Sequence, residues 1–154
     1  HYTNDSGRND IITCKVAVDE KNIFFLAETQ EALTPCTDNN WMLLLIDADQ
    51  NHDTGWHGYD FLINKNIKDD KTTSVLHYGA DAAWTEKAEV AYQAVGNQIE
   101  LTIPREWLGL KGDTVTFDFH WCDNPQELKD PISLCTHGDS APNRRFNYRC
   151  IWKR

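Results

Sequence analysis

Residues 114–122 read Thr-Val-Thr-Phe-Asp-Phe-His-Trp-Cys, and this stretch indicates the fold class most clearly. Apolar residues recur at every second position from Val115 to Trp121 and alternate with the polar residues Asp118 and His120. Successive side chains of a β-strand point to opposite faces, so this alternation predicts a strand with one face in the core and the other outside it.

Other segments on both sides of this stretch are also short, rich in β-branched and aromatic residues, and bounded by Gly, Pro, Asn or Asp. These predicted strands are 11–18, 22–28, 41–47, 58–63, 73–78, 88–94, 98–103 and 145–152. The segment 41–47 is almost wholly apolar, as a strand buried on both faces would be. A single short helix is expected at 104–110, where Pro104 takes the first position and Gly109 lies near the end.

Many short strands with almost no helix predict an all-β fold. We expect an antiparallel β-sandwich, immunoglobulin-like or jelly-roll, with one short helix, because two sheets can bury each other's apolar faces without helical cover. The 154 residues fit a single domain, residues 1–154, that is long enough to bury a core. We expect this domain to be a piece of a larger multidomain protein.

The formal net charge of −9 at pH 7 argues against nucleic acid as a partner, because nucleic-acid binding depends on clustered Lys and Arg. The longest apolar run, Trp41 to Ile46, is far shorter than the ~20 residues that span a bilayer, so no membrane insertion is expected. The five cysteines leave at least one unpaired, and none has metal-ligand spacing. We expect buried free thiols, although one or two disulfides would fit a secreted domain.

The segment 47–55 follows an apolar strand and carries oxygen-bearing side chains at every second position. These residues are Asp47, Asp49, Asn51 and Asp53. Alternate residues of a tight loop can turn several oxygens toward one point, so the spacing predicts a Ca²⁺ site that orders the loop. It is not an EF-hand, since His52 and Gly58 replace the required glycine and acidic residue. The alternative is a set of Asx turns without a metal.

Aromatic residues lie just beyond this loop at Trp56, His57 and Tyr59, and Trp84 lies in a stretch that we expect to be a loop. Exposed indoles bind sugars by stacking on the apolar C–H face of a pyranose. We therefore predict a ligand-binding site formed by Trp56, His57, Tyr59 and Trp84. The alternative is that these residues belong to the core, as most tryptophans do.

A glycosidase would need two carboxyl groups about 5 to 10 Å apart across a sugar. The sequence offers Asp118 and Asp123 near His120, together with Glu100 and Asp139. Nothing in the pattern places such a pair in a cleft, and no motif of a serine hydrolase, HExxH protease or nucleotide-binding enzyme is present. We expect a protein that is not an enzyme, with a glycosidase as the least favoured alternative.

Taken together, these motifs resemble family 9 carbohydrate-binding modules and the wider DOMON-like superfamily, which are β-sandwich domains of bacterial polysaccharide-degrading proteins. The matching segments are GRNDI at 7–11, VAVDEKNIFFLAET at 16–29, NWMLLLIDADQNHDTGWHGYDFLIN at 40–64, ELTIPREWLGL at 100–110, FDFHWCDN at 117–124 and GDSAPNRRFNY at 138–148. The resemblance implies a sandwich, a structural Ca²⁺ at the junction of strand and loop, and attachment to a larger secreted protein, often one with a glycoside hydrolase domain.

The function expected on this basis is non-catalytic recognition of a polysaccharide or oligosaccharide. The location that goes with it is secreted, periplasmic or at the cell surface. The alternative is a spacer or docking domain that binds no sugar and packs against a neighbouring domain of the same chain.

Overall fold

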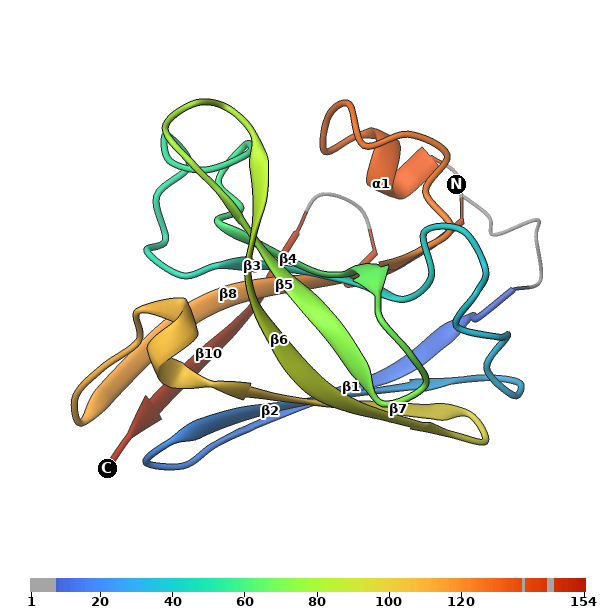
Figure 1. The fold of residues 1–154 in the computed structure, drawn as a ribbon, viewed down its shortest axis with the longest axis horizontal. Helices are drawn as coiled ribbons and strands as arrows, with labels where there is room; N and C mark the ends of the chain where they lie inside the picture. The colour runs from blue at the N-terminus through green and yellow to red at the C-terminus, as the bar shows by residue number, and fades with distance from the viewer. Residues whose placement is uncertain (1–7, 137, 144–145) are drawn as a thin grey trace.

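The computed structural model describes residues 8–136, 138–143 and 146–154, drawn as a ribbon in Figure 1. The strands are β1 (Ile11–Val18), β2 (Asn22–Thr29), β3 (Leu43–Asp47), β4 (Phe61–Ile67), β5 (Thr72–Tyr78), β6 (Trp84–Val95), β7 (Gln98–Pro104), β8 (Thr114–Asp123), β9 (Asp139–Ala141) and β10 (Tyr148–Lys153). The helices are the 3-10 helix η1 (Arg105–Leu108) and the short α-helix α1 (Ser133–Thr136).

All ten strands belong to one antiparallel sheet in the order β1-β2-β7-β6-β5-β4-β3-β8-β10, and β9 also pairs with β8. The sheet curls until its two end strands lie on the same side of the molecule (Figure 1). One end of this side is held together by the backbone N–H of Ile11 in β1, which donates to Asp139 Oδ2 in β9 over 2.6 Å. The result is a nearly closed barrel.

The all-β antiparallel class is confirmed, but the structure has one curled sheet where the sequence predicted two packed sheets. Alternation along a strand shows which residues face the core, and it does not distinguish a sandwich from a barrel. The distinction comes from pairings between strands that are distant in sequence. Ile23 of β2 pairs with Ile103 of β7, and Leu45 of β3 pairs with His120 of β8, which makes the sheet continuous.

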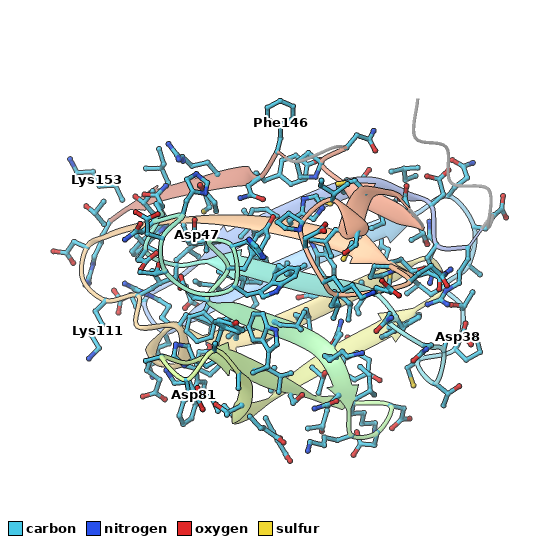
Figure 2. The ribbon with its side chains drawn as sticks, turned by 90° about the horizontal axis from the view of Figure 1, so that it is seen from above. Asp38, Asp47, Asp81, Lys111, Phe146 and Lys153 are labelled. Carbon is cyan, nitrogen blue, oxygen red and sulfur yellow. The ribbon has the colours of Figure 1, made fainter. Side chains whose placement is uncertain are left out.

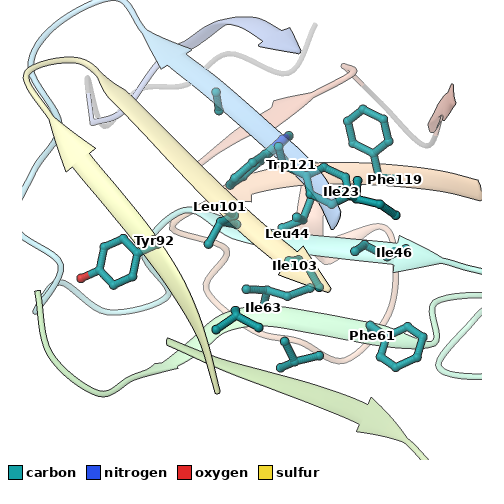
Figure 3. Packing of buried hydrophobic residues seen from close by; sticks show 14 of the residues in the cluster. Ile23, Leu44, Ile46, Phe61, Ile63, Tyr92, Leu101, Ile103, Phe119 and Trp121 are labelled. Carbon is teal, nitrogen blue, oxygen red and sulfur yellow. The ribbon is translucent and has the colours of Figure 1, made fainter. Parts of the chain in front are cut away.

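The barrel interior holds the main hydrophobic core (Figure 3), where residues such as Leu44, Leu101 and Trp121 converge from different strands. Phe25 of β2 lies edge-on to two rings of β8, with centroid distances of 5.7 Å to Phe117 and 5.4 Å to Phe119. Such aromatic pairs add about 0.5–1.5 kcal/mol beyond the area that they bury. The alternating apolar face predicted for residues 114–122 is therefore the lining of this core.

A second, smaller apolar cluster covers the outer face of the sheet. It contains Leu43, Leu45, Trp56, Tyr59, Leu62, Leu76, Cys122 and Leu134. Residues 43–47 are buried on both faces for this reason, as their apolar run predicted. The far face of β8 differs from the prediction, because His120 is buried instead of facing solvent and Cys122 belongs to this cluster.

Most predicted strands match the structure within a few residues. The main differences are β6, which begins at Trp84 where a loop was expected, and β9 and α1, which were not expected at all. The predicted helix at 104–110 is shortened to η1, and the predicted strand at 145–152 begins at Tyr148, with residue 145 outside the described residues. No disulfide joins the five cysteines, all of which lie in the described ranges. Within the described ranges, neither helix is long and apolar enough to cross a membrane.

Candidate metal and ligand site

The loop between β3 and β4 brings two aspartates together through the strand register. Ile46 pairs with Phe61, so Asp47 at the end of β3 and Asp60 just before β4 are the next positions along the same ladder. The N–H of Asp60 donates to the carbonyl of Ile46 over 2.8 Å, and the N–H of Ala48 donates to Asp60 Oδ2 over 2.9 Å. The hairpin itself therefore fixes the distance between the two carboxylates.

Asp49 completes an acidic group that we call the aspartate triad, formed by Asp47, Asp49 and Asp60. One carboxylate oxygen of each lies within 4.8 Å of the others. Opposite ligands of a Ca²⁺ ion at about 2.4 Å would lie about 4.8 Å apart, so the spacing suits oxygen ligands around one hard cation. The triad could hold a metal ion, with two buried carboxylates and one exposed one.

The electrostatics of the triad favour a cation. Asp47 is only 2% exposed, and its Oδ1 has no hydrogen-bond partner among the described residues. Burial, with the charges of Asp60 and Asp49 adding to it, raises the pKa of Asp47 to about 6, and burial also raises the pKa of Asp60. A bound cation would lower the pKa values of both carboxyl groups again, because an opposite charge favours the ionised carboxylates. It would also give the unpaired oxygen of Asp47 a partner.

Outside the triad, the predicted ligands are Asn51 and Asp53, and Asx turns hold this part of the loop. Asn51 Oδ1 accepts the N–H of Asp53 over 3.0 Å, and Asp49 Oδ1 accepts the N–H of Asn51 over 3.0 Å, so both make Asx turns. Asp53 itself is exposed. The structure thus brings together Asp47 and Asp49 of the predicted set and adds Asp60, which the sequence reading missed. The register of the β3–β4 hairpin was the signal that could have found it.

The predicted aromatic site is folded inward instead of presenting an open indole face. Trp56 is 8% exposed and Tyr59 6% exposed, because they form a small antiparallel bridge that turns both rings into the outer cluster. Their rings stack with centroids 6.3 Å apart, and Trp84 lies 6.4 Å from Trp56 as a half-buried residue of β6. His57 alone is exposed. The role of these residues in ligand binding stays a prediction.

A pocket of about 400 Å³ lies directly beside the triad and shares Asp47 with it. Its lining residues are Asp47, His52, His57, Gly58, Tyr59, Asp130, Pro131, Ile132 and Asn147. The hydroxyl of Tyr59 donates to Asn147 Oδ1 over 2.7 Å, which links the loop between β3 and β4 to the segment before β10. Figure 2 shows Asp47 at this loop.

Three predicted site residues, Asp47, His57 and Tyr59, therefore line one pocket. The sequence reading missed its other wall, which comes from residues 130–132 and Asn147. These residues lie far from the loop in sequence and reach it only because β8 pairs with β3 and β10 pairs with β8.

Of the carboxylates considered for a glycosidase, Asp118, Asp123 and Asp139 accept hydrogen bonds that stabilise the fold. Asp118 accepts two hydrogen bonds from the Arg149 guanidinium, at 2.9 and 3.2 Å. Asp139 binds the N–H of Ile11, and Glu100 is exposed on β7. Burial lowers the pKa of His120 to about 4, so this imidazole is neutral at pH 7.

A comparison of the chain with protein-family models, with curated proteins and with solved structures found no significant match. The resemblance to family 9 carbohydrate-binding modules therefore stays a prediction from the motifs.

Proposed function

We propose that this chain is a non-catalytic carbohydrate-binding module that binds a glycan in the pocket beside a Ca²⁺ ion held by the aspartate triad. The observation that carries this proposal is that one buried residue, Asp47, belongs to both the triad and the pocket. A cation bound by the triad would order the loop from Asp47 to Asp60, and that loop supplies most of the pocket wall.

The chemistry of the pocket suits a sugar. Its volume of about 400 Å³ lies within the range of small-molecule sites. Tyr59, Pro131 and Ile132 give it an apolar side, while His57 and Asn147 offer hydrogen-bonding groups for hydroxyls. A pyranose needs both, because its C–H face is apolar and its rim is polar.

Ca²⁺ suits the triad better than Mg²⁺. Ca²⁺ accepts six to eight oxygens in irregular geometry, whereas Mg²⁺ demands near-ideal octahedral geometry at shorter distances. A loop that supplies three carboxylates, with carbonyls or waters for the remaining positions, fits the less demanding ion. Extracellular modules bind Ca²⁺ in the 10⁻⁴–10⁻³ M range, which accords with the secreted, periplasmic or cell-surface location that we propose.

The test combines thermal unfolding with a glycan screen, each run with Ca²⁺ and with a chelator. Saturation at about 100 times the Kd stabilises a protein by about 2.7 kcal/mol, which in a domain of this size raises Tm by roughly 5–10 °C. The double variant Asp47→Asn and Asp60→Asn should lose this rise. The matched control Asp53→Asn changes an exposed carboxylate of the same loop outside the triad and should keep it.

Glycan binding should fall with the chelator and with His57→Ala, while Lys71→Ala, which changes an exposed residue outside the pocket, should leave it unchanged. A Ca²⁺-dependent Tm without any glycan binding would overturn the sugar-binding role and leave the metal site standing. Equal loss of the Ca²⁺ response in Asp53→Asn would overturn the triad as the ligand set.

A docking domain that binds no sugar is the second candidate. The observation that favours it is the burial of Trp56 and Tyr59, which removes the open aromatic platform expected of a sugar-binding surface. A folded domain that binds no polysaccharide with or without Ca²⁺ would support this function instead.

A further inference from the structure

The two end strands of the sheet run in the same direction. Nine strands lie on the path from β1 to β10, and each neighbouring pair along it is antiparallel. An antiparallel barrel closes only with an even number of strands, because each strand must oppose both neighbours. One further strand, antiparallel to β1 and to β10, would complete it.

We call the space between these end strands the seam. Paired strands lie about 4.7–4.9 Å apart, so an inserted strand needs its two neighbours about 9–10 Å apart. Most Cα atoms of β1 lie more than 8 Å from those of β10. Among the described residues, no backbone hydrogen bond joins the two strands. At the start of β1 the Ile11 N–H donates to Asp139 of β9, so a further strand could pair only beyond this contact.

Apolar side chains at the seam are incompletely covered. Val16 of β1 and Trp152 of β10 pack against the main core but are only half-buried, whereas the central strand β3 is fully buried. Ile12 and Ile151 on the same two strands are 50% and 70% exposed. Beyond the seam, Trp152 lines a cavity of about 700 Å³ next to the turn between β1 and β2. An apolar side chain placed in the seam could therefore pack against the half-buried Val16 and Trp152.

The charge of the seam identifies the kind of strand that fits. β1 carries Lys15 and β10 carries Lys153, both exposed, and neither strand contains Asp or Glu. Arg149 of β10 is already paired with Asp118 of β8. This edge is basic in a chain with a net charge of −9. A second copy of the chain would bring the same basic edges and would be repelled, whereas an acidic segment would be attracted.

We propose that the seam between β1 and β10 is a docking site for an extended acidic segment of a partner protein, which adds as a strand between them. Backbone pairing to the two edges would supply affinity, and side-chain alternation would supply specificity. Apolar residues of the segment would face the core beside Val16 and Trp152, and acidic residues would face solvent beside Lys15 and Lys153. Figure 2 shows Lys153 at the outer end of β10.

The experiment measures binding of three labelled synthetic peptides, each about eight residues long, which is near the length of a strand. One alternates Val with Glu, one alternates Val with Lys, and the third is the Val-Glu peptide with N-methyl groups on alternate amides that block backbone pairing. The expected result is binding of the unmethylated Val-Glu peptide alone, with slower amide hydrogen exchange in β1 and β10.

Charge reversal gives the matched test on the protein side. The double variant Lys15→Glu and Lys153→Glu should weaken binding of the Val-Glu peptide by about tenfold or more, since both exposed charges lie on the seam strands. The control variant Lys71→Glu with Lys129→Glu makes the same change in net charge outside β1 and β10, and it should weaken binding of the Val-Glu peptide less. No binding, equal binding of the methylated or Val-Lys peptide, or protection outside β1 and β10 would overturn the proposal. Glycan binding should not change, because the pocket contains no residue of either strand.

Discussion

The guanidinium of Arg8 lies 3.0 Å from Asp123 Oδ2, and this ion pair anchors the start of the described chain to the end of β8. Asp123 is fully buried, and its other oxygen accepts the N–H of Met42 over 2.9 Å and the side-chain amide of Asn9 over 3.1 Å. These bonds offset the burial that raises the pKa of Asp123.

Arg8→Ala should therefore destabilise the domain by about 3–5 kcal/mol, because it leaves a buried carboxylate without its cation. Urea unfolding of the variant at pH 7 measures the loss. Arg8→Ala combined with Asp123→Asn should recover part of it, since the amide has no charge to bury. A loss below about 1 kcal/mol for Arg8→Ala would mean that the pair contributes no more than a surface ion pair.

Trp56→Ala should cost about 3–5 kcal/mol, because its buried indole packs against Tyr59 in the outer cluster. His57→Ala changes the exposed neighbouring residue and should alter stability by no more than about 0.5 kcal/mol. Urea midpoints of the two variants make the comparison. Near-equal stabilities would show that the indole is open to solvent and available as a sugar platform.

His120 should make stability fall as the pH drops below about 6.5. Its Nδ1–H donates to the carbonyl of Phe146 over 3.0 Å, and burial lowers its pKa from 6.5 to about 4. As the pH falls, His120 of the unfolded chain therefore becomes protonated near pH 6.5, whereas His120 of the folded chain becomes protonated only near pH 4. The contribution is fully present above pH 6.5 and is lost as the pH falls toward 4.

His120→Asn keeps an N–H donor near this position and cannot titrate. Between pH 7 and pH 5, the wild type should lose about 2 kcal/mol of unfolding free energy relative to this variant. Chemical denaturation at both values measures the difference, and other titrating groups cancel in the comparison. Parallel pH profiles of the two proteins would contradict a buried neutral imidazole.

Arg105 should not be replaceable by lysine. Its buried guanidinium donates to the carbonyls of Asp19, Glu20, Leu110 and Gly112. It also lies 5.1 Å from the ring centroid of Trp152. A lysine ammonium cannot reach carbonyls on both sides at once, so Arg105→Lys should cost about 2–4 kcal/mol. Lys111→Ala, an exposed change in the same cavity, should fall within about 0.5 kcal/mol in the same urea assay.

The sequence predicted what depends on local pattern. Alternation located the core-facing residues of 114–122, and the apolar run at 41–47 predicted burial on both faces. The alternate spacing of oxygen-bearing residues included Asp47 and Asp49, which the structure places in an acidic group that could hold a metal ion.

What the sequence could not predict depends on which distant strands pair. Curvature into a barrel follows from the β2–β7 and β3–β8 pairings, which no local pattern specifies. The Trp56 side chain is buried because residue 56 forms a bridge with Tyr59 and because the indole packs in a cluster with apolar residues of β3, β4 and α1. Asn147 enters the pocket for the same reason, through a strand order that only the folded sheet establishes.

Those same distant pairings have a kinetic consequence. The hairpin β1–β2 and the meander β3 to β7 can form from neighbouring segments, but the sheet is complete only after β2 meets β7 and β3 meets β8. Both steps bring together strands that are far apart in the sequence. The chain entropy is lost when the loop closes, before the native contacts that compensate for it have formed. We expect refolding on the millisecond-to-second scale typical of all-β domains with high contact order. The rate-limiting step should be the capture of β8 by β3, which also assembles the pocket beside Asp47.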